Sequence, residues 1–229
     1  DDAREAVATA EAVGAPVLVV HSGCRGGHTR SHAHRLLVEA LETLAPVASR
    51  AGVALAVKPV HPGACPGCSF LADLEVALDL VDQFADPAVR LAVDLWHFGD
   101  EPGLPMLLPR LATAAAVVQA ADRAGPPTPG ADRLPAGHGG LPLEDVLGDL
   151  LAHGYEGVVE FDPVGEAVEI LGYDGVWLET RLVADAWGDR LGAAVARSGF
   201  PVGSRRVHFR TADSGILKSH ASSHSGSTG

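Results

Sequence analysis

The sequence of 229 residues is poor in basic side chains, with 17 Lys and Arg against 29 Asp and Glu and a formal net charge of -12. This acidic excess argues against a nucleic-acid-binding protein and against one that attaches to an acidic membrane surface. No apolar run comes near the roughly 20 residues that cross a bilayer. Residues 1–14 lack the basic and then apolar layout of a secretory signal peptide.

Cysteine is scarce as well, and the 3 cysteines form no even set for a disulfide framework. We therefore expect a cytoplasmic protein in a reducing compartment. The phosphate-binding motifs GxGxxG and GxxxxGK[ST] are missing, so nucleotide binding has no support in the sequence. Apolar residues are plentiful at 47%, which is enough for a sizeable core in one domain.

Short apolar runs recur along the chain, and each ends abruptly in a polar residue. The runs and their closing residues are 16–20 with His21, 53–57 with Lys58, 90–93 with Asp94, 114–118 with Gln119 and 157–159 with Glu160. Continuous rather than alternating apolar runs are typical of strands covered on both faces, as in a parallel sheet. The sequence therefore predicts five parallel strands.

Segments between these runs carry apolar residues at helical spacing, for example in 37–48 and 74–84. Strands that alternate with helices form βα units with right-handed crossovers. In such folds ligands bind beyond the carboxyl ends of the strands. We therefore expect the five closing residues to form a ring at one mouth, although any one of them could simply mark where burial stops.

The character of the sequence changes near residue 201. Residues 201–229 are rich in Ser, His and Gly and contain few apolar side chains. Such a composition buries too little surface to offset its ordering entropy. We expect a domain over residues 1–200 and a disordered, low-complexity tail over 201–229.

Several segments, in the right order, carry a resemblance to a known family. They are 12–23 (AVGAPVLVVHSG), 51–62 (AGVALAVKPVHP), 91–97 (LAVDLWH), 117–122 (VVQAAD), 132–139 (DRLPAGHG) and 154–160 (GYEGVVE). The chain resembles the sugar phosphate isomerase/epimerase family, the xylose isomerase-like TIM barrels. The resemblance implies a (β/α)8 barrel of which only the last five βα units are present.

The resemblance also implies a chemistry. Enzymes of this family hold a divalent metal (Mn, Mg, Co or Zn) with Glu, Asp, His and Glu, and they act on a small sugar or sugar phosphate. Moving a proton between adjacent carbons of a ketose, an aldose or a hydroxy-keto acid passes through an enediolate. The metal stabilises the oxygens of that intermediate, and two carboxylates act as acid and base.

The family's metal-site roles fall on four positions of this sequence. By resemblance, Asp94 is a metal ligand, and Glu160 is both the last ligand and the second acid/base. Gln119 stands where a ligand histidine is expected, and Lys58 stands where the first ligand and catalytic glutamate is expected.

Three further residues are candidates for binding the substrate. His97, in the Asp-x-x-His motif, matches the family's substrate-facing histidine, and His21 closes the first apolar run. Arg133 could bind a phosphate or hydroxyl groups bidentately, or it could be an ordinary surface arginine. His138 replaces the acidic residue of the family's glycine loop.

The substitutions at Lys58 and Gln119 alter the expected metal site. Lys58 brings a positive charge to the cation's position and would pair with Asp94 and Glu160, which favours its charged form. Gln119 offers only a neutral amide oxygen, a poor ligand for borderline metals. We therefore hypothesise a metal-free pocket, in an isomerase-like enzyme or in a non-catalytic protein that binds a sugar or carboxylate. A third possibility is a fragment completed by another chain or by a homo-oligomer.

The motif Cys65-Pro-Gly-Cys68 remains ambiguous in the sequence. It is either an ordinary loop or a redox pair, and a zinc site would need a second ligand pair at suitable spacing. The nearby His28, His32 and His34 are best explained as a solvated loop and helix start.

Overall fold

The computed structural model describes residues 2–197, 208–211 and 214–218. Its strands are β1 (Val17–His21), β2 (Ala54–Lys58), β3 (Val89–Asp94), β4 (Ala115–Gln119), β5 (Val158–Phe161), β6 (His208–Thr211) and β7 (Ser214–Lys218). Its helices are α1 (Asp2–Ala12), α2 (Arg30–Ala51), α3 (Leu74–Val81), α4 (Leu95–Phe98), α5 (Leu104–Ala114), α6 (Leu143–Ala152) and α7 (Glu166–Arg197). The five predicted strands are confirmed.

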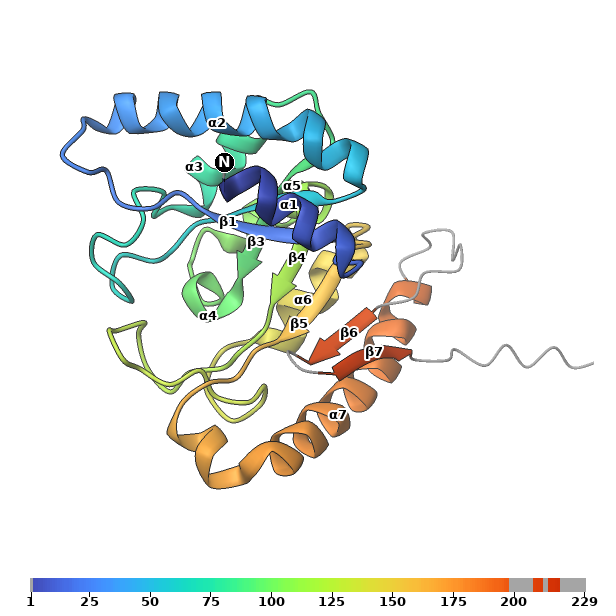
Figure 1. The fold of residues 1–229 in the computed structure, drawn as a ribbon. Coiled ribbons are helices and arrows are strands. Elements are labelled where there is room, and N and C mark those ends of the chain that lie inside the picture. The colour runs from blue at the N-terminus through green and yellow to red at the C-terminus, as the bar shows by residue number, and fades with distance from the viewer. Residues whose placement is uncertain (1, 198–207, 212–213, 219–229) are drawn as a thin grey trace, which may run out of the picture.

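The strands form one sheet in chain order, so the colour runs from blue at β1 to red at β7 (Figure 1). Neighbours are parallel from β1 to β6, and β7 pairs antiparallel with β6. A parallel sheet with a helix between successive strands is the partial (β/α)8 barrel that the sequence predicts. Within the described residues, β1 forms the first edge of the sheet and pairs only with β2.

Register brings the polar ends of the strands to one edge of the sheet. His21 is aligned with Lys58, and Gln119 is aligned with Asp94 on one side and with Glu160 on the other. Parallel pairing makes this alignment possible, because all carboxyl ends then point the same way. The residues that close the apolar runs therefore lie in a row.

Two apolar layers hold the sheet. The larger core joins alternate residues of the strands, such as Leu55 and Leu91, to helix residues such as Leu41 and Leu78, all with less than 2% of their surface exposed. The opposite face of the sheet carries small residues, with Ala56, Ala92 and Val117 in a separate cluster. The continuous apolar runs in the sequence thus reflect burial on both faces.

Glycine ends the helix before β2. Gly52 adopts a left-handed backbone conformation (φ 67°), and its N–H donates to the carbonyl groups of Ala48 and Ser49. This arrangement is the usual glycine helix stop, in which only glycine avoids a Cβ penalty. It ends α2 at Ala51 and sets the start of β2, which ends at Lys58.

Two short segments of the predicted tail lie within the described residues. Residues 208–211 form β6, which pairs parallel with β5, and residues 214–218 form β7, which pairs antiparallel with β6. Alternation in His208–Thr211 and the Gly-Ile-Leu sequence of β7 supply short strand-forming segments that composition alone obscured. The remaining residues of 201–229 lie outside the described residues.

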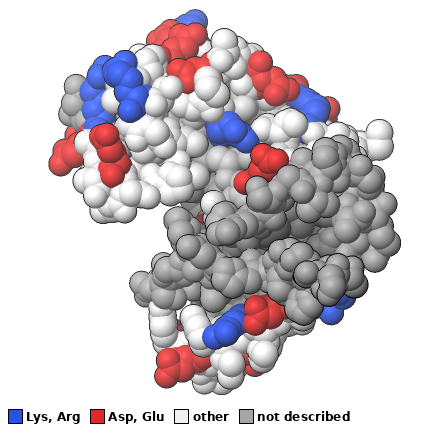
Figure 2. Space-filling model, turned by 90° about the vertical axis from the view of Figure 1, so that its right-hand side faces the viewer, with Lys and Arg blue, Asp and Glu red and all other residues white. Residues whose placement is uncertain are grey.

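The described chain contains no helix that is long and apolar enough to cross a membrane. On the face drawn in Figure 2, the described Lys and Arg side chains stand among Asp and Glu side chains and form no continuous basic patch.

Candidate functional site

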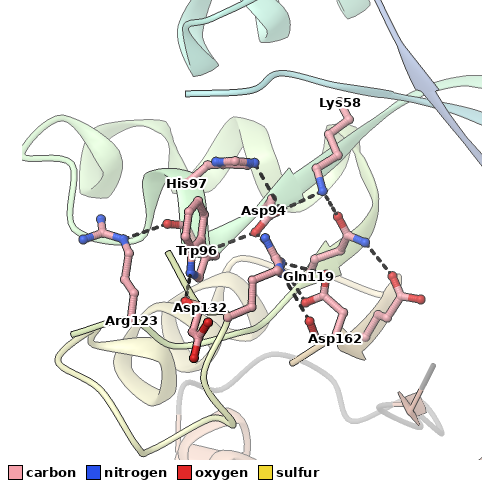
Figure 3. Close-up of polar contacts among 10 residues, drawn as sticks. Lys58, Asp94, Trp96, His97, Gln119, Arg123, Asp132 and Asp162 are labelled. Atoms are coloured by element: carbon pink, nitrogen blue, oxygen red, sulfur yellow. Dashed lines mark hydrogen bonds and ion pairs between the residues drawn. The ribbon is translucent and has the colours of Figure 1, made fainter. Parts of the chain in front are cut away.

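Four of the predicted site residues meet at the carboxyl ends of neighbouring strands (Figure 3). The Nζ atom of Lys58 lies 2.6 Å from Oδ2 of Asp94 and donates a hydrogen bond of 2.5 Å to Oε1 of Gln119. The Nε2 atom of Gln119 in turn donates to Oε2 of Glu160 at 2.7 Å. A continuous polar chain therefore runs from β3 through β2 and β4 to β5.

Asp94 is the centre of this cluster and is fully buried. Its Oδ1 atom accepts hydrogen bonds of 3.0 Å from Nη2 of Arg133 and from the backbone N–H of Trp96. Burial alone would raise the pKa of Asp94, but the nearby charges of Arg133 and Lys58, with His97, lower it to about 2. Asp94 is therefore a permanent anion held between two cations.

The position of His97 follows from the local backbone. Asp94 is the N-cap of the short helix α4, so the residue three positions later turns back toward it. Nε2 of His97 lies 3.6 Å from Oδ2 of Asp94, while Nδ1 is buried with no hydrogen-bond partner among the described residues. Burial of the ring lowers the pKa of His97 to about 4. The charges of Lys58 and Arg133 add to this shift, and the charge of Asp94 opposes it. His97 is therefore neutral near pH 7.

Arg133 reaches the cluster from the loop between β4 and α6. Its Nη2 atom bonds both carboxylate oxygens of Asp162, at 2.8 and 2.7 Å, in addition to Asp94. The guanidinium lies over the Trp96 ring at 5.3 Å, and the Trp96 indole donates to the carbonyl of Asp132. The guanidinium predicted to bind substrate is thus engaged by two carboxylates of the protein.

Sequence reasoning missed Asp162 and Trp96. Asp162 lies two residues beyond Glu160, and Trp96 lies inside the Asp-x-x-His motif. The period of two along an extended chain is the signal that could have placed Asp162 on the same side as Glu160. Burial raises the pKa of Asp162 to about 6, with Asp94 adding to the shift and Arg133 opposing it.

Two other predicted residues lie outside this chain of contacts. His21 ends the edge strand β1 beside Lys58 and is exposed, and partial burial of its ring together with the Lys58 charge lowers its pKa. His138, from the glycine loop, pairs instead with Glu179 of α7. His21 therefore lies at the accessible edge of the row of strand ends, on the β1 side of Lys58.

The residues do not fit the divalent metal that the resemblance implies. The Lys58 ammonium already contacts an oxygen of Asp94 and the oxygen of Gln119, two of the three predicted ligands. Across the described part of the chain, no group of three or more His, Cys, Asp or Glu side chains is placed to hold a metal ion. A cation at this position would meet a like charge within contact distance.

Comparison with known proteins gives a consistent family. A family model described as xylose isomerase-like TIM barrel matches residues 1–196. Among solved structures, an IolI protein crystallised with a bound zinc atom superposes with a TM-score of 0.68 at 18% identity, over 87% of this chain and 69% of that one. A search of curated proteins found no match.

Two further solved structures show the same fold. A protein from Sinorhizobium meliloti 1021 has 27% identity and a TM-score of 0.61, over 86% of this chain and 68% of that one. D-psicose 3-epimerase from Clostridium cellulolyticum H10, crystallised with D-tagatose, has 14% identity and a TM-score of 0.64, over 85% of this chain and 69% of that one.

Proposed function

The chain belongs to the xylose isomerase-like TIM barrel family, and from this premise we propose that it binds a neutral sugar without a metal ion and without isomerising it. The observation that carries this proposal is the position of Lys58. Its ammonium lies 2.6 Å from Asp94 and 2.5 Å from Gln119, so it occupies the cation's place and neutralises the buried carboxylate. The family's epimerase members supply the substrate class, a small sugar.

The charges of the cluster favour a neutral ligand over an anionic one. Lys58 and Arg133 are each already paired with carboxylates of the protein, namely Asp94 and Asp162. A sugar phosphate or a carboxylate would have to displace these partners and leave a buried anion without its cation. Hydroxyl groups of a sugar need only a hydrogen-bond donor or acceptor.

The open side of the cluster offers such groups. Glu160 is partly exposed and uses Oε2 to accept from Gln119, while its Oε1 has no hydrogen-bond partner among the described residues. The exposed His21 adds a ring nitrogen on the other side of Lys58. Carboxylate and imidazole groups both bind sugar hydroxyls through hydrogen bonds.

The same geometry argues against enediolate chemistry. That reaction needs an electrophile at the substrate oxygens, and the two cations of the cluster, Lys58 and Arg133, are already engaged by protein carboxylates. It also needs a pair of carboxylates flanking the reacting carbons, but Lys58 stands in place of the first one. Glu160 alone remains from the pair.

The test compares the full chain with variants that rebuild the metal site. Elemental analysis and titration calorimetry with Mn²⁺ should find no stoichiometric metal in the natural protein, and D-tagatose binding should be unchanged by EDTA. The double substitution Lys58→Glu with Gln119→His should create Mn²⁺ binding. Its matched control, Lys58→Gln with Gln119→His, should bind Mn²⁺ at least about tenfold more weakly because it lacks the added carboxylate.

Two results would overturn the proposal. One is a stoichiometric divalent metal in the natural protein that is lost in Asp94→Asn. The other is conversion of D-tagatose to another sugar in the presence of EDTA, which would show a metal-free isomerase in which Glu160 acts as the acid/base.

A further inference from the structure

The loop that follows Lys58 carries a disulfide between Cys65 and Cys68. Residues 59–73 connect β2 to α3, and the cysteines lie at the tip of this loop. The sequence left this motif open between an ordinary loop and a redox pair.

The turn brings the two cysteines together through its backbone. Pro66 and Gly67 occupy the central positions, Gly67 has φ 80°, and the N–H of Cys68 donates to the carbonyl of Cys65 at 3.2 Å. Proline followed by a left-handed glycine is the signature of a type II turn. This turn can form whether the two cysteines are oxidised or reduced. The Cα atoms are 5.5 Å apart, within the usual range for a disulfide. Both thiols therefore stay close after reduction and can pair again.

The disulfide is open to an external reagent on one side. Cys68 is exposed and Cys65 is partly exposed. Thiol–disulfide exchange requires that an attacking thiolate reach one of the two sulfurs. Cys68 meets this requirement, so a reductant has access without unfolding the domain.

The loop is tied to the end of β1, next to the polar cluster. Phe70 N–H donates to the carbonyl of Gly23 at 3.0 Å, and the hydroxyls of Ser22 and Ser69 are 2.7 Å apart. The N–H of Leu71 donates to the hydroxyl of Ser22 at 3.3 Å, and the N–H of Val60, two residues after Lys58, donates to the carbonyl of Leu71 at 3.0 Å. These contacts begin immediately after Cys68, so the disulfide restrains the segment that makes them.

We propose that Cys65 and Cys68 form a reversible redox site that a small or protein dithiol reduces, and that its disulfide holds the loop against Ser22 and Gly23. A thiolate of the reductant attacks Sγ of Cys68, the bond between the two protein sulfurs breaks, and Cys65 leaves as a thiolate that takes up a proton. The second thiol of the reductant then attacks the reductant's first sulfur in the mixed disulfide. Cys68 leaves as a thiolate and is protonated in turn. The protein gains two electrons and two protons, and the reductant leaves as its disulfide. This inference does not depend on sugar binding.

The first test counts thiols in the folded full chain across glutathione buffers of increasing oxidation. The number of reactive thiols should fall reversibly from three, all the cysteines of the chain, to one, the exposed Cys24. In a Cys24→Ser control it should fall to none. A pair that stays reduced throughout, a pair that dithiothreitol does not reduce, or peptide mapping that joins Cys24 to Cys68 would each overturn the proposal.

The second test measures hydrogen exchange with and without dithiothreitol. Reduction should speed exchange at the amides of Phe70 and Leu71 by about tenfold, because the loop loses a covalent restraint. Cys65→Ser with Cys68→Ser should show the fast exchange in both buffers, and Cys24→Ser should behave like the natural protein. Unchanged exchange on reduction of the natural protein would show that the disulfide does not hold the loop.

Discussion

The two sides of the polar cluster differ in how completely the protein satisfies its own groups. On the side formed by β2 to β4, Lys58, Asp94 and Gln119 are each no more than 9% exposed, and Lys58 contacts both of the others directly. On the sides formed by β5 and β1, Glu160 and His21 remain accessible, and Glu160 uses only one oxygen in a hydrogen bond within the described residues. The closed side balances its charges within the protein, and the open side is where we propose that a ligand binds.

This difference separates stability from binding. Removing one member of a buried ion pair leaves the other charge uncompensated, which is far more costly than losing an exposed pair. Substitutions on the closed side should therefore lower the free energy of unfolding more, while those on the open side should mainly change ligand affinity.

The largest effect is expected from Asp94→Asn. The substitution keeps the size of the side chain but leaves Lys58 and Arg133 without their shared buried anion. We expect the free energy of unfolding to fall by about 3–5 kcal/mol. Urea unfolding followed by circular dichroism measures it at a single pH near neutrality.

The matched control is Asp79→Asn, on the surface. Asp79 is 63% exposed and pairs with Arg110, which also binds Asp82. Its loss should cost no more than about 1 kcal/mol. Adding Lys58→Met to Asp94→Asn should restore at least about 1 kcal/mol by removing an unpaired cation. Equal losses in the two Asp→Asn variants would contradict the comparison.

The sequence was sufficient to predict the strands of the sheet, because burial on both faces produces continuous apolar runs. The runs before Lys58, Asp94 and Gln119 are continuous and apolar, and they became the central strands. The polar residue that closes each run also predicted that the strand ends lie in a row, because parallel pairing places all the carboxyl ends at one edge of the sheet. These features depend on periodicity and order along the chain.

The contact of Lys58 with Asp94 was expected from their charges, but the contacts of Arg133 could not be predicted in the same way. That Arg133 binds Asp162 as well as Asp94 depends on how the long loop after β4 folds over the strand ends. The strands at 208–211 and 214–218 were likewise hidden, because a composition rich in Ser and His outweighed a few residues with strand propensity. Contacts between loops that are distant in the chain produce no periodic pattern of apolar residues in the sequence.

The pH dependence of stability gives a second test, with two opposing contributions. The pKa of His97 is lowered to about 4, so the unfolded chain binds its proton first, and this contribution falls as the pH drops from about 6.5 to 4. The pKa of Asp162 is raised to about 6, so the folded chain binds its proton first, and this contribution rises as the pH drops from about 6 to 4. Each contribution is on the order of 3 kcal/mol, and because their signs are opposite they partly offset each other in the natural protein.

Single substitutions should reveal the two contributions separately. His97→Asn should become more stable as the pH falls from 6 to 4, because only the Asp162 contribution remains. Asp162→Asn should lose stability over the same range. Urea unfolding at a series of pH values measures both slopes, and parallel curves for the two variants would show that neither group titrates as its burial implies.

The smallest effect on stability, and the largest on binding, is expected from Glu160→Gln. The amide oxygen of the new side chain can still accept from Gln119, so unfolding should become easier by no more than about 1 kcal/mol. A sugar hydroxyl, however, loses a charged acceptor, which should weaken D-tagatose binding by about fivefold to tenfold. Calorimetry with D-tagatose measures this loss, and Glu42→Gln, at an exposed position of α2, serves as the control with unchanged affinity. If Glu160→Gln instead destabilised the fold as much as Asp94→Asn while leaving affinity intact, the open side would be as structural as the closed one.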